Sequence, residues 1–216
     1  MTETTQHGET QHGASQHGAT EPDRAQRTAQ RMVEVATELA TEGGYDAVQM
    51  REVARRVPIA LATLYRYYPS KDALLRAVIG AQLTALDDDV RRRPPRHKTA
   101  GARAAAVFIR GFHAMVRDQG LAHATMSVFQ MPRPLKQPDG TPRPTPEAGT
   151  RSHRFADLAA RAAWGADHET TPREAEALAI MESLWVGCMV GWLDGQVSGD
   201  EVESRLRFAA ERLVGD

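Results

Sequence analysis

This chain of 216 residues has little cysteine, almost no net charge and few long apolar runs. The single cysteine, Cys188, excludes a disulfide within the chain and is typical of proteins in a reducing cytoplasm. The formal net charge is −1, so no basic field covers the whole molecule. The N-terminus lacks the apolar segment of a signal peptide. The most apolar run, from Leu178 to Leu193, contains Glu182 and is too short to cross a bilayer. We therefore expect a cytoplasmic protein that does not enter a membrane.

Sequence patterns typical of enzymes are missing as well. The chain has no glycine-rich phosphate loop, no His-Glu-x-x-His and no Cys-x-x-Cys. Cys188 lies in an apolar run, where a thiol usually packs without reacting. Asp87, Asp88 and Asp89 are consecutive, so their side chains point in different directions and predict a solvated helix end rather than an acid–base pair. We expect no enzyme, no metal site and no cofactor.

Two segments of low complexity are not expected to fold into helices. Residues 1–22 contain three Gln-His-Gly repeats and little to bury, which predicts a disordered tail. His7, His12 and His17 in these repeats could bind a metal ion adventitiously, but nothing orders their imidazoles, and a solvated tail is the favoured interpretation. Residues 131–146 contain six prolines and predict an exposed loop.

Elsewhere apolar residues recur at spacings of three and four, and no useful β alternation appears, so we expect an all-α protein. Gly43 and Gly44 supply a left-handed end for the first helix, and Pro58 ends the second. A basic, proline-containing linker at 91–98 separates the early helices from the later ones. The spacing predicts helices over about 23–42, 49–57, 60–67, 70–86, 105–116, 155–162, 173–196 and 199–213.

The segment from residue 49 to residue 71 has the outline of a helix-turn-helix, which spans about 49–68 and has a tight break at Pro58. It holds five basic residues and one acid, a local excess of four positive charges on a nearly neutral chain. A positive patch of this kind is typical of a nucleic-acid interface confined to one face. The side chains that we expect to bind phosphates are Thr63, Tyr67 and Lys71, and those that reach base edges are Tyr65 and Arg66.

The segment from Gln26 to Leu86 resembles the TetR family of one-component repressors. The resemblance is carried by a first helix ending in Gly-Gly-Tyr, by the run from Met50 to Ala54, and by the nine residues from Thr63 to Lys71, a motif that is specific for that family. It implies a dimer of all-helical subunits that binds a palindromic operator in double-stranded DNA. It also implies a small molecule that binds the C-terminal domain and moves apart the DNA-binding domains of the two subunits, the reading heads.

The resemblance divides the chain into an N-terminal DNA-binding domain at 23–86 and a helical ligand-binding and dimerisation domain at 87–216, joined by the long fourth helix. Carried onto this chain, it implies that Thr63, Tyr67 and Lys71 contact phosphates, while Leu61 borders the bases. The residues expected to contact DNA are Gln49, Arg51, Leu61, Thr63, Tyr65, Arg66, Tyr67 and Lys71.

Three residues depart from the family's pattern. Pro58 stands where a glycine is usual and, because its ring does not allow a positive φ, it predicts a different turn. Ala60 stands where a serine or threonine often caps the recognition helix, which removes about 1 kcal/mol of stabilisation. Gln49 replaces the hydroxyl residue that commonly begins the second helix, although its amide can still reach a phosphate.

Within the family, the stretch from Gly43 to Arg51 is similar to the KstR-type repressors of sterol and lipid catabolism, which implies a lipid-like or acyl-coenzyme A effector. Arg110, His113 and His123 are polar candidates for orienting such a ligand, with a surface position as the alternative. Core packing is the alternative for each of the apolar candidates. The expected pocket residues are Phe108, Phe112, Met115, Met126, Phe129, Trp164, Trp185 and Met189.

Gly187, Gly191 and Gly195 recur every four residues on the last long apolar helix, a spacing that lets another helix approach closely. The family's final two helices normally form a homodimer interface, so we expect Trp192 and Leu206 to join Gly187 and Gly191 there. Packing within one chain is the alternative.

The favoured interpretation is a ligand-responsive transcriptional repressor that a small apolar effector releases from its operator. The alternative is a helical DNA-binding or architectural protein with neither a specific operator nor an effector, which an altered turn and an uncapped recognition helix would allow. The ratio of specific to non-specific DNA affinity distinguishes the two.

Overall fold

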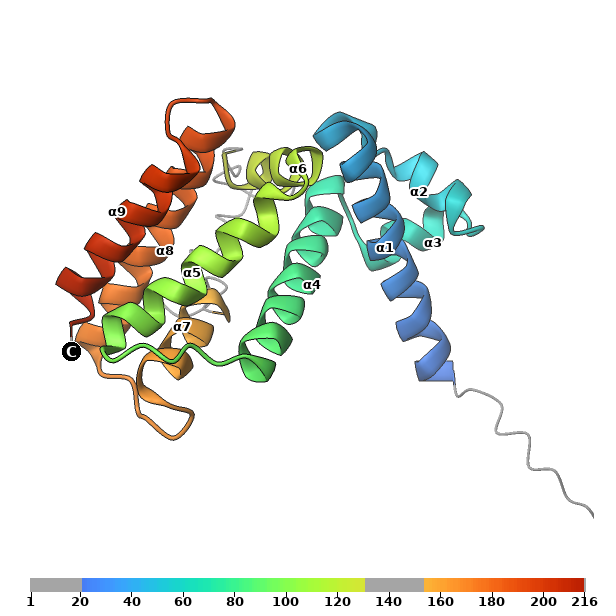
Figure 1. Ribbon diagram of the computed structural model, residues 1–216. Coiled ribbons are helices and arrows are strands. Elements are labelled where there is room, and N and C mark those ends of the chain that lie inside the picture. Colours follow the sequence, from blue (N-terminus) through green and yellow to red (C-terminus); the bar gives the residue numbers. More distant parts are fainter. Residues whose placement is uncertain (1–20, 131–153, 216) are drawn as a thin grey trace, which may run out of the picture.

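The computed structural model describes residues 21–130 and 154–215, and in these two ranges all regular structure is helical (Figure 1). This confirms the all-α prediction. The predicted tail lies outside the described residues except for Glu21 and Pro22, which begin the first helix, and the His7, His12 and His17 repeats and the predicted loop at 131–146 lie outside them entirely. The helices are α1 (Glu21–Ala47), α2 (Met50–Arg56), α3 (Leu61–Tyr67), α4 (Lys71–Arg92), α5 (Ala100–Val116), α6 (Gln119–Gln130), α7 (Arg154–Trp164), α8 (Pro172–Leu193) and α9 (Gly199–Leu213).

The described helices enclose two hydrophobic cores. α1, α2 and α3 lie at one end of the molecule, α5, α7, α8 and α9 at the other, and α4 and α6 between them (Figure 1). The first core packs Met32 and Leu39 of α1 against Leu64 of α3 and Leu74 of α4. The large buried residues of the second core include Phe108, Phe112, Phe155, Leu178, Met181, Trp185 and Leu206.

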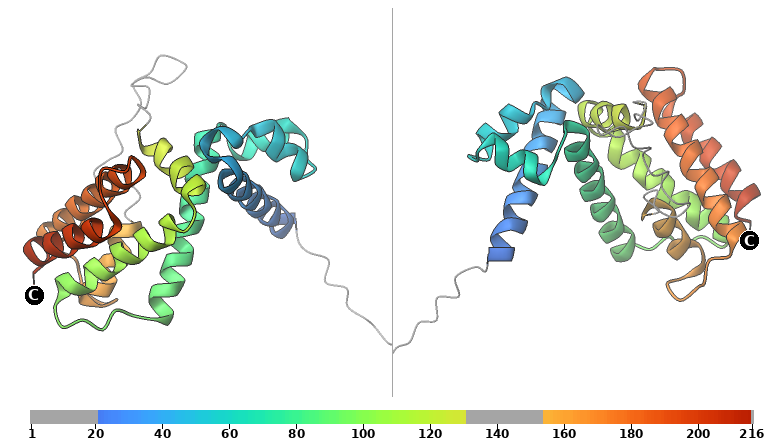
Figure 2. Two further views of the ribbon diagram at one scale, coloured as in Figure 1. Left: turned by 45° about the horizontal axis from the view of Figure 1, so that its top comes forward. Right: turned by 180° about the vertical axis from the view of Figure 1, so that it is seen from behind.

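α6 was not predicted from the spacing of apolar residues, and it belongs to both cores. Its Ala124 and Val128 are buried in the first core, whereas Ala122 and Met126 are buried in the second. Apolar residues on two sides of a helix blur the single stripe on which sequence recognition depends. α6 therefore lies between the two halves of the molecule, as both views in Figure 2 show.

The C-terminal end of α4 is tied to the second half of the molecule. The helix does not end at the three consecutive aspartates, as predicted, but continues to Arg92. Asp87 accepts hydrogen bonds from Arg91 at 3.0 Å and from Arg161 of α7 at 2.9 Å, while Asp89 pairs with Arg93 and lies 3.7 Å from the guanidinium of Arg110 in α5. The expected solvated helix end is wrong, because these carboxylates connect α4 to α5 and α7.

α8 is long and apolar enough by length and composition to cross a membrane, so the prediction that this run is too short is corrected. The helix begins with Pro172 and a capping box, in which Thr171 and Glu174 satisfy each other's backbone amides. One of its faces, which includes Leu178 and Met181, is buried in the second core. α8 thus packs as a core helix.

The turn between α2 and α3 keeps a left-handed residue although that residue is a proline. The amide of Ile59 donates to the carbonyl of Ala54, five residues earlier, at 3.0 Å. This is the 6→1 hydrogen bond of a Schellman motif at the end of a helix. Pro58 occupies the left-handed position with a φ of 25° and has no N–H for the second bond. The expectation that proline would avoid positive φ is therefore wrong, and the turn is strained because the ring favours a φ near −65°.

We expect Pro58→Gly to raise the free energy of unfolding by about 1–2 kcal/mol. Glycine relieves backbone strain of about 1–3 kcal/mol and restores an N–H donor. It also increases the conformational entropy of the unfolded chain, which lowers the stability by about 0.4–1 kcal/mol. Pro58→Ala is the matched control, since it restores the N–H but keeps a Cβ at positive φ, and should gain less. Urea unfolding followed by circular dichroism measures both. A glycine variant less stable than the natural chain would contradict the strain.

Candidate nucleic-acid interface

α3 is a short amphipathic helix that buries one residue, Leu64, and exposes its polar side chains. Leu64 is fully buried in the first core, whereas Tyr65 is 46% exposed and Arg66 is also exposed. Thr63 and Tyr67 are half-buried at the border between these faces. The helix thus presents an aromatic ring, a guanidinium and two hydroxyl groups along one surface, which are groups that bind base edges and phosphates.

Neither helix of the predicted helix-turn-helix has a side-chain cap at its start. Ala60 precedes α3 and Gln49 precedes α2, and neither side chain bonds to the first turn that follows. The predicted loss of the cap at Ala60 is confirmed. Gln49 and Arg51 are exposed at the beginning of α2, and Leu61 is half-buried at the beginning of α3.

Glu52 neutralises much of the positive charge that the sequence places on α2. Its carboxylate accepts hydrogen bonds from Arg55 at 2.6 and 2.8 Å and from Arg56 at 2.9 Å. These two guanidinium groups, Arg55 first, lower the pKa of Glu52 to about 2. Arg56 also makes two 2.9 Å bonds to Glu42 of α1. Glu52 is already counted in the local excess of four charges, so Glu42 lowers that excess to three and joins α2 to α1. Arg51 and Arg66 are exposed, and neither pairs with a carboxylate that the structure describes.

Lys71 has a structural contact that the sequence did not indicate. Its ammonium donates to the backbone carbonyl of Tyr45 at 2.9 Å and lies 3.7 Å from the centre of the Tyr45 ring, and burial lowers its pKa. The Tyr45 hydroxyl donates to Asp72 at 2.9 Å. Gly44, with a φ of 69°, allows the bend that brings Tyr45 toward the start of α4. Lys71 therefore joins α4 to α1 and retains two of its three donors for a phosphate.

Ser70 begins α4 as predicted, since its hydroxyl oxygen accepts the amide of Ala73 at 3.1 Å. The cap orients the first turn of α4 directly after α3. Among the residues that the structure describes, no group of three or more His, Cys, Asp or Glu side chains is placed to hold a metal ion.

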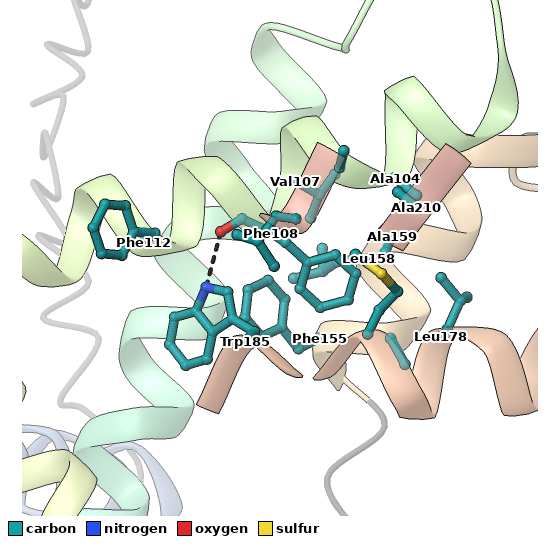
Figure 3. Packing of buried hydrophobic residues seen from close by; sticks show 14 of the residues in the cluster. Ala104, Val107, Phe108, Phe112, Phe155, Leu158, Ala159, Leu178, Trp185 and Ala210 are labelled. Carbon is teal, nitrogen blue, oxygen red and sulfur yellow. Dashed lines mark hydrogen bonds between the residues drawn. The ribbon is translucent and has the colours of Figure 1, made fainter. Parts of the chain in front are cut away.

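Most of the predicted effector-pocket residues come together in the second core, where they pack against one another (Figure 3). Phe155 lies between Phe108, at a ring distance of 4.7 Å, and Trp185, at 5.0 Å. The Trp185 indole donates to the carbonyl of Phe108 at 2.9 Å. The sequence predicted a helix at 155–162 but not the central position of Phe155 among these rings. Phe112, Met115, Met126 and Met189 are buried in the same core, Trp164 is half-buried, and the side chain of Phe129 lies outside the described residues.

The polar candidates for the pocket have other partners. His113 lies 2.8 Å from Glu203 of α9, and Arg110 donates to the backbone carbonyl of Arg93. His123 is exposed. Two surface hollows in the described part of the chain, of about 340 and 260 Å³, are lined neither by these residues nor by the aromatic cluster.

The predicted dimer residues are divided between the surface and the core. Gly187 of α8 is exposed with open space above it, whereas Gly191 faces Val197 and Trp192 packs edge-on against Phe112. Leu206 is fully buried inside its own subunit, so its predicted place at an interface is wrong. Gly195 lies in the turn after α8, with a φ of 69°, rather than on the helix. The exposed apolar side chains of the last two helices are instead Ile180, at 44%, and Phe208, at 62%.

Comparison with known proteins extends the resemblance well beyond the DNA-binding segment. A model of the family described as bacterial regulatory proteins, tetR family, matches residues 32–78. The HTH-type transcriptional repressor KstR of Rhodococcus jostii is 30% identical over 187 residues, covering 87% of this chain and 82% of the relative. KstR of Mycobacterium tuberculosis is 29% identical over 201 residues, covering 87% and 80%. A crystal structure of a TetR transcriptional regulator from Rhodococcus sp. RHA1 matches with a TM-score of 0.75 and 31% identity, over 88% of this chain and 97% of that one.

We expect Arg66→Ala and Tyr67→Phe to weaken DNA binding in different ways. If Arg66 contacts a base as predicted, the first variant should relax the preference at one base position by about 1–3 kcal/mol. If Tyr67 contacts a phosphate as predicted, the second should lower affinity equally on all sequences. Fluorescence anisotropy with duplexes that differ at single base pairs, at one fixed salt concentration, separates the two. A uniform loss for the arginine variant would make Arg66 a phosphate contact instead.

Proposed function

The chain belongs to the TetR family of bacterial regulatory proteins, and we propose that it is a cytoplasmic homodimeric repressor that binds a palindromic operator and leaves it when a small apolar molecule binds. The observation that carries the proposal is the similarity to KstR repressors over more than four fifths of this chain. The similarity includes the DNA-binding helices and the helical half that follows them. The proposed domains are those expected from the sequence, 23–86 for DNA binding and 87–216 for ligand binding and dimerisation.

In the proposed complex α3 enters the major groove of the operator. Tyr65 and Arg66, which are exposed, read base edges, and Leu61 borders them. Thr63 and Tyr67 bind phosphates beside the groove, and the free donors of Lys71 add a third contact of this kind. Gln49 and Arg51, exposed at the start of α2, face the opposite strand's backbone.

The dimer proposal is supported by apolar side chains that one subunit leaves uncovered. Ile180 and Gly187 lie on the side of α8 opposite the buried Met181 and Trp185. On α9, Phe208 is 62% exposed, although the guanidinium of Arg212 lies 5.4 Å from its ring. A two-fold interface formed by α8 and α9 would remove these side chains from water and set the spacing of the two reading heads.

The effector proposal starts from the apolar second core and from the likeness to repressors of lipid catabolism. The Phe, Met and Trp side chains of this core are packed, so a ligand must displace some of them, and the flexible Met126 and Met189 are suited to moving. Arg91 and Arg93 of the basic linker pair with Asp87 and Asp89. The exposed Arg92, Arg96 and Lys98 remain to attract the phosphates of a coenzyme A group.

α6 offers a route from this core to the DNA. Met126 faces the second core, and at the other end of the helix Gly120 lies against the backbone of α1, so a shift of α6 moves α1. To release the operator, the ligand must prefer the DNA-incompetent arrangement. A 100-fold preference corresponds to about 2.7 kcal/mol of coupling, and operator DNA must then weaken ligand binding by the same factor.

The direct test is a screen of fatty acyl and steroid acyl coenzyme A thioesters against the complex of this protein with DNA from upstream of its own gene. We expect symmetric protection of that DNA in a footprint and its loss when an active thioester is added. Random DNA of equal length is the control. Equal affinity for both DNAs would favour the architectural alternative. Release by a polar compound but by none of the thioesters would contradict the lipid effector and leave the ligand switch intact.

We expect Phe208→Glu to shift the protein toward monomer, because a charge would have to be buried at the proposed interface. Sedimentation at micromolar concentration measures the shift, and operator affinity should fall with it. Ala114→Glu, an exposed position on α5, is the matched control and should remain dimeric. A natural protein that sediments as a monomer would contradict the dimer.

A further inference from the structure

A basic hollow lies beside the start of the recognition helix, and its arginines precede the residues that the family model matches. It has a volume of about 260 Å³ and is formed between the first half of α1 and the turn that leads into α3. Its polar lining comes from one helix, and the turn supplies an apolar wall. The lining residues are Arg24, Arg27, Thr28, Arg31, Val57 and Ile59.

The three arginines share one face of α1, because their spacings of three, four and seven bring helical residues to the same side. Arg31 is held by Glu34 and Glu38, each at 3.1 Å. Arg24 and Arg27 are exposed, and neither pairs with any carboxylate that the structure describes. No acidic residue lines the hollow.

This distribution contrasts with that on α2, where Glu52 and Glu42 neutralise Arg55 and Arg56. Two guanidinium groups without acidic partners therefore remain in one concave site on α1. Guanidinium groups are planar and present paired donors that match the oxygens of a phosphate, so the chemistry of the hollow fits a phosphodiester.

The position of the hollow indicates which phosphodiester it meets. Ile59 lies in its wall, and α3 begins two residues later at Leu61. When a recognition helix occupies the major groove, the elements packed beside its start lie over the sugar–phosphate backbone that borders the groove. We infer that Arg24 and Arg27 form an additional phosphate clamp on α1, which binds the DNA backbone flanking the base pairs that α3 reads.

The clamp rests on the proposed operator binding and adds two consequences to it. It lengthens the DNA that each subunit needs, because its phosphates lie outside the segment read by α3. It also adds sequence-independent affinity that falls with salt, since each bound phosphate releases counterions.

The test compares the natural protein with the double variant Arg24→Ala/Arg27→Ala on two duplexes. One duplex ends at the base pairs protected by α3, and the other extends by several base pairs on each side. We expect the natural protein to prefer the longer duplex and the variant to bind both alike. The slope of log affinity against log salt should become shallower by about 0.9 for every phosphate that the variant no longer binds, or about 1.8 per subunit.

Arg117→Ala/Arg173→Ala is the matched control, because it removes the same two charges from exposed positions at the end of α5 and at the start of α8. It should keep both the length preference and the salt slope. Ethylation interference locates the clamp, since its phosphates are those whose ethylation blocks the natural protein but not the Arg24/Arg27 variant.

The outcomes separate this inference from the function on which it rests. If the natural protein binds its operator but the Arg24/Arg27 variant keeps the same length preference and slope, the clamp is overturned and the repressor stands. If the natural protein binds no DNA, both are overturned. A fall of affinity in the control equal to that in the variant would also overturn the clamp, because net charge alone would explain the effect.

Discussion

The close contact of α1 with α6 is the constraint on which the arrangement of the two halves depends. A Cβ at Gly120 would lie 2.7 Å from the carbonyl oxygen of Ala40 and 2.8 Å from that of Thr41, so the backbones meet at a distance that glycine alone permits. Asp118 strengthens the same joint, because its carboxylate caps α6 by accepting the amide of Leu121 at 2.8 Å and also accepts the hydroxyl of Thr41. The end of α1 and the start of α6 are therefore fixed to each other.

Two further joints involve α4, one at each end. At its start, Lys71 contacts Tyr45 of α1 through a hydrogen bond and the face of the ring. At its far end, Asp87 pairs with Arg161 of α7. The reading head thus meets the rest of the subunit through a tight backbone contact and through a helix anchored at both ends. Packed joints of this kind move as units rather than deform gradually, which is the property that a switch between two spacings requires.

Electrostatics divides the arginines of the first four helices into two groups. Arg31, Arg55 and Arg56 pair with glutamates of α1 and α2, and the pair of Arg56 with Glu42 joins these two helices. Such exposed pairs add little stability individually, but they remove positive charge from the surface. The cations that remain on α1 and α3 are those that we assign to DNA. A nearly neutral protein can therefore present a positive surface where its carboxylates are used internally.

The sequence by itself determined the helical class, the helix-turn-helix and its family, because these depend on local spacing and on a contiguous motif. Ser70 as a cap and the uncapped Ala60 were predictable for the same reason. The predictions from the sequence were wrong or incomplete wherever a residue far along the chain determines how a side chain is packed or paired. Asp87 became a link to α7, Leu206 became core, and α6 was missed because each of its two faces serves a different core.

The tertiary structure alone decided which charges are free, which apolar residues stay exposed and what lies beside the recognition helix. No periodicity shows that Arg56 is held by Glu42, or that Arg24 and Arg27 share a hollow with the turn before α3. Phe155 lies at the centre of the aromatic cluster because α7 packs on α5, and Phe208 is exposed because it lies on the side of α9 that does not face α5. Spacing along a helix fixes the face on which a residue lies, whereas the helix that covers that face is settled by long-range packing.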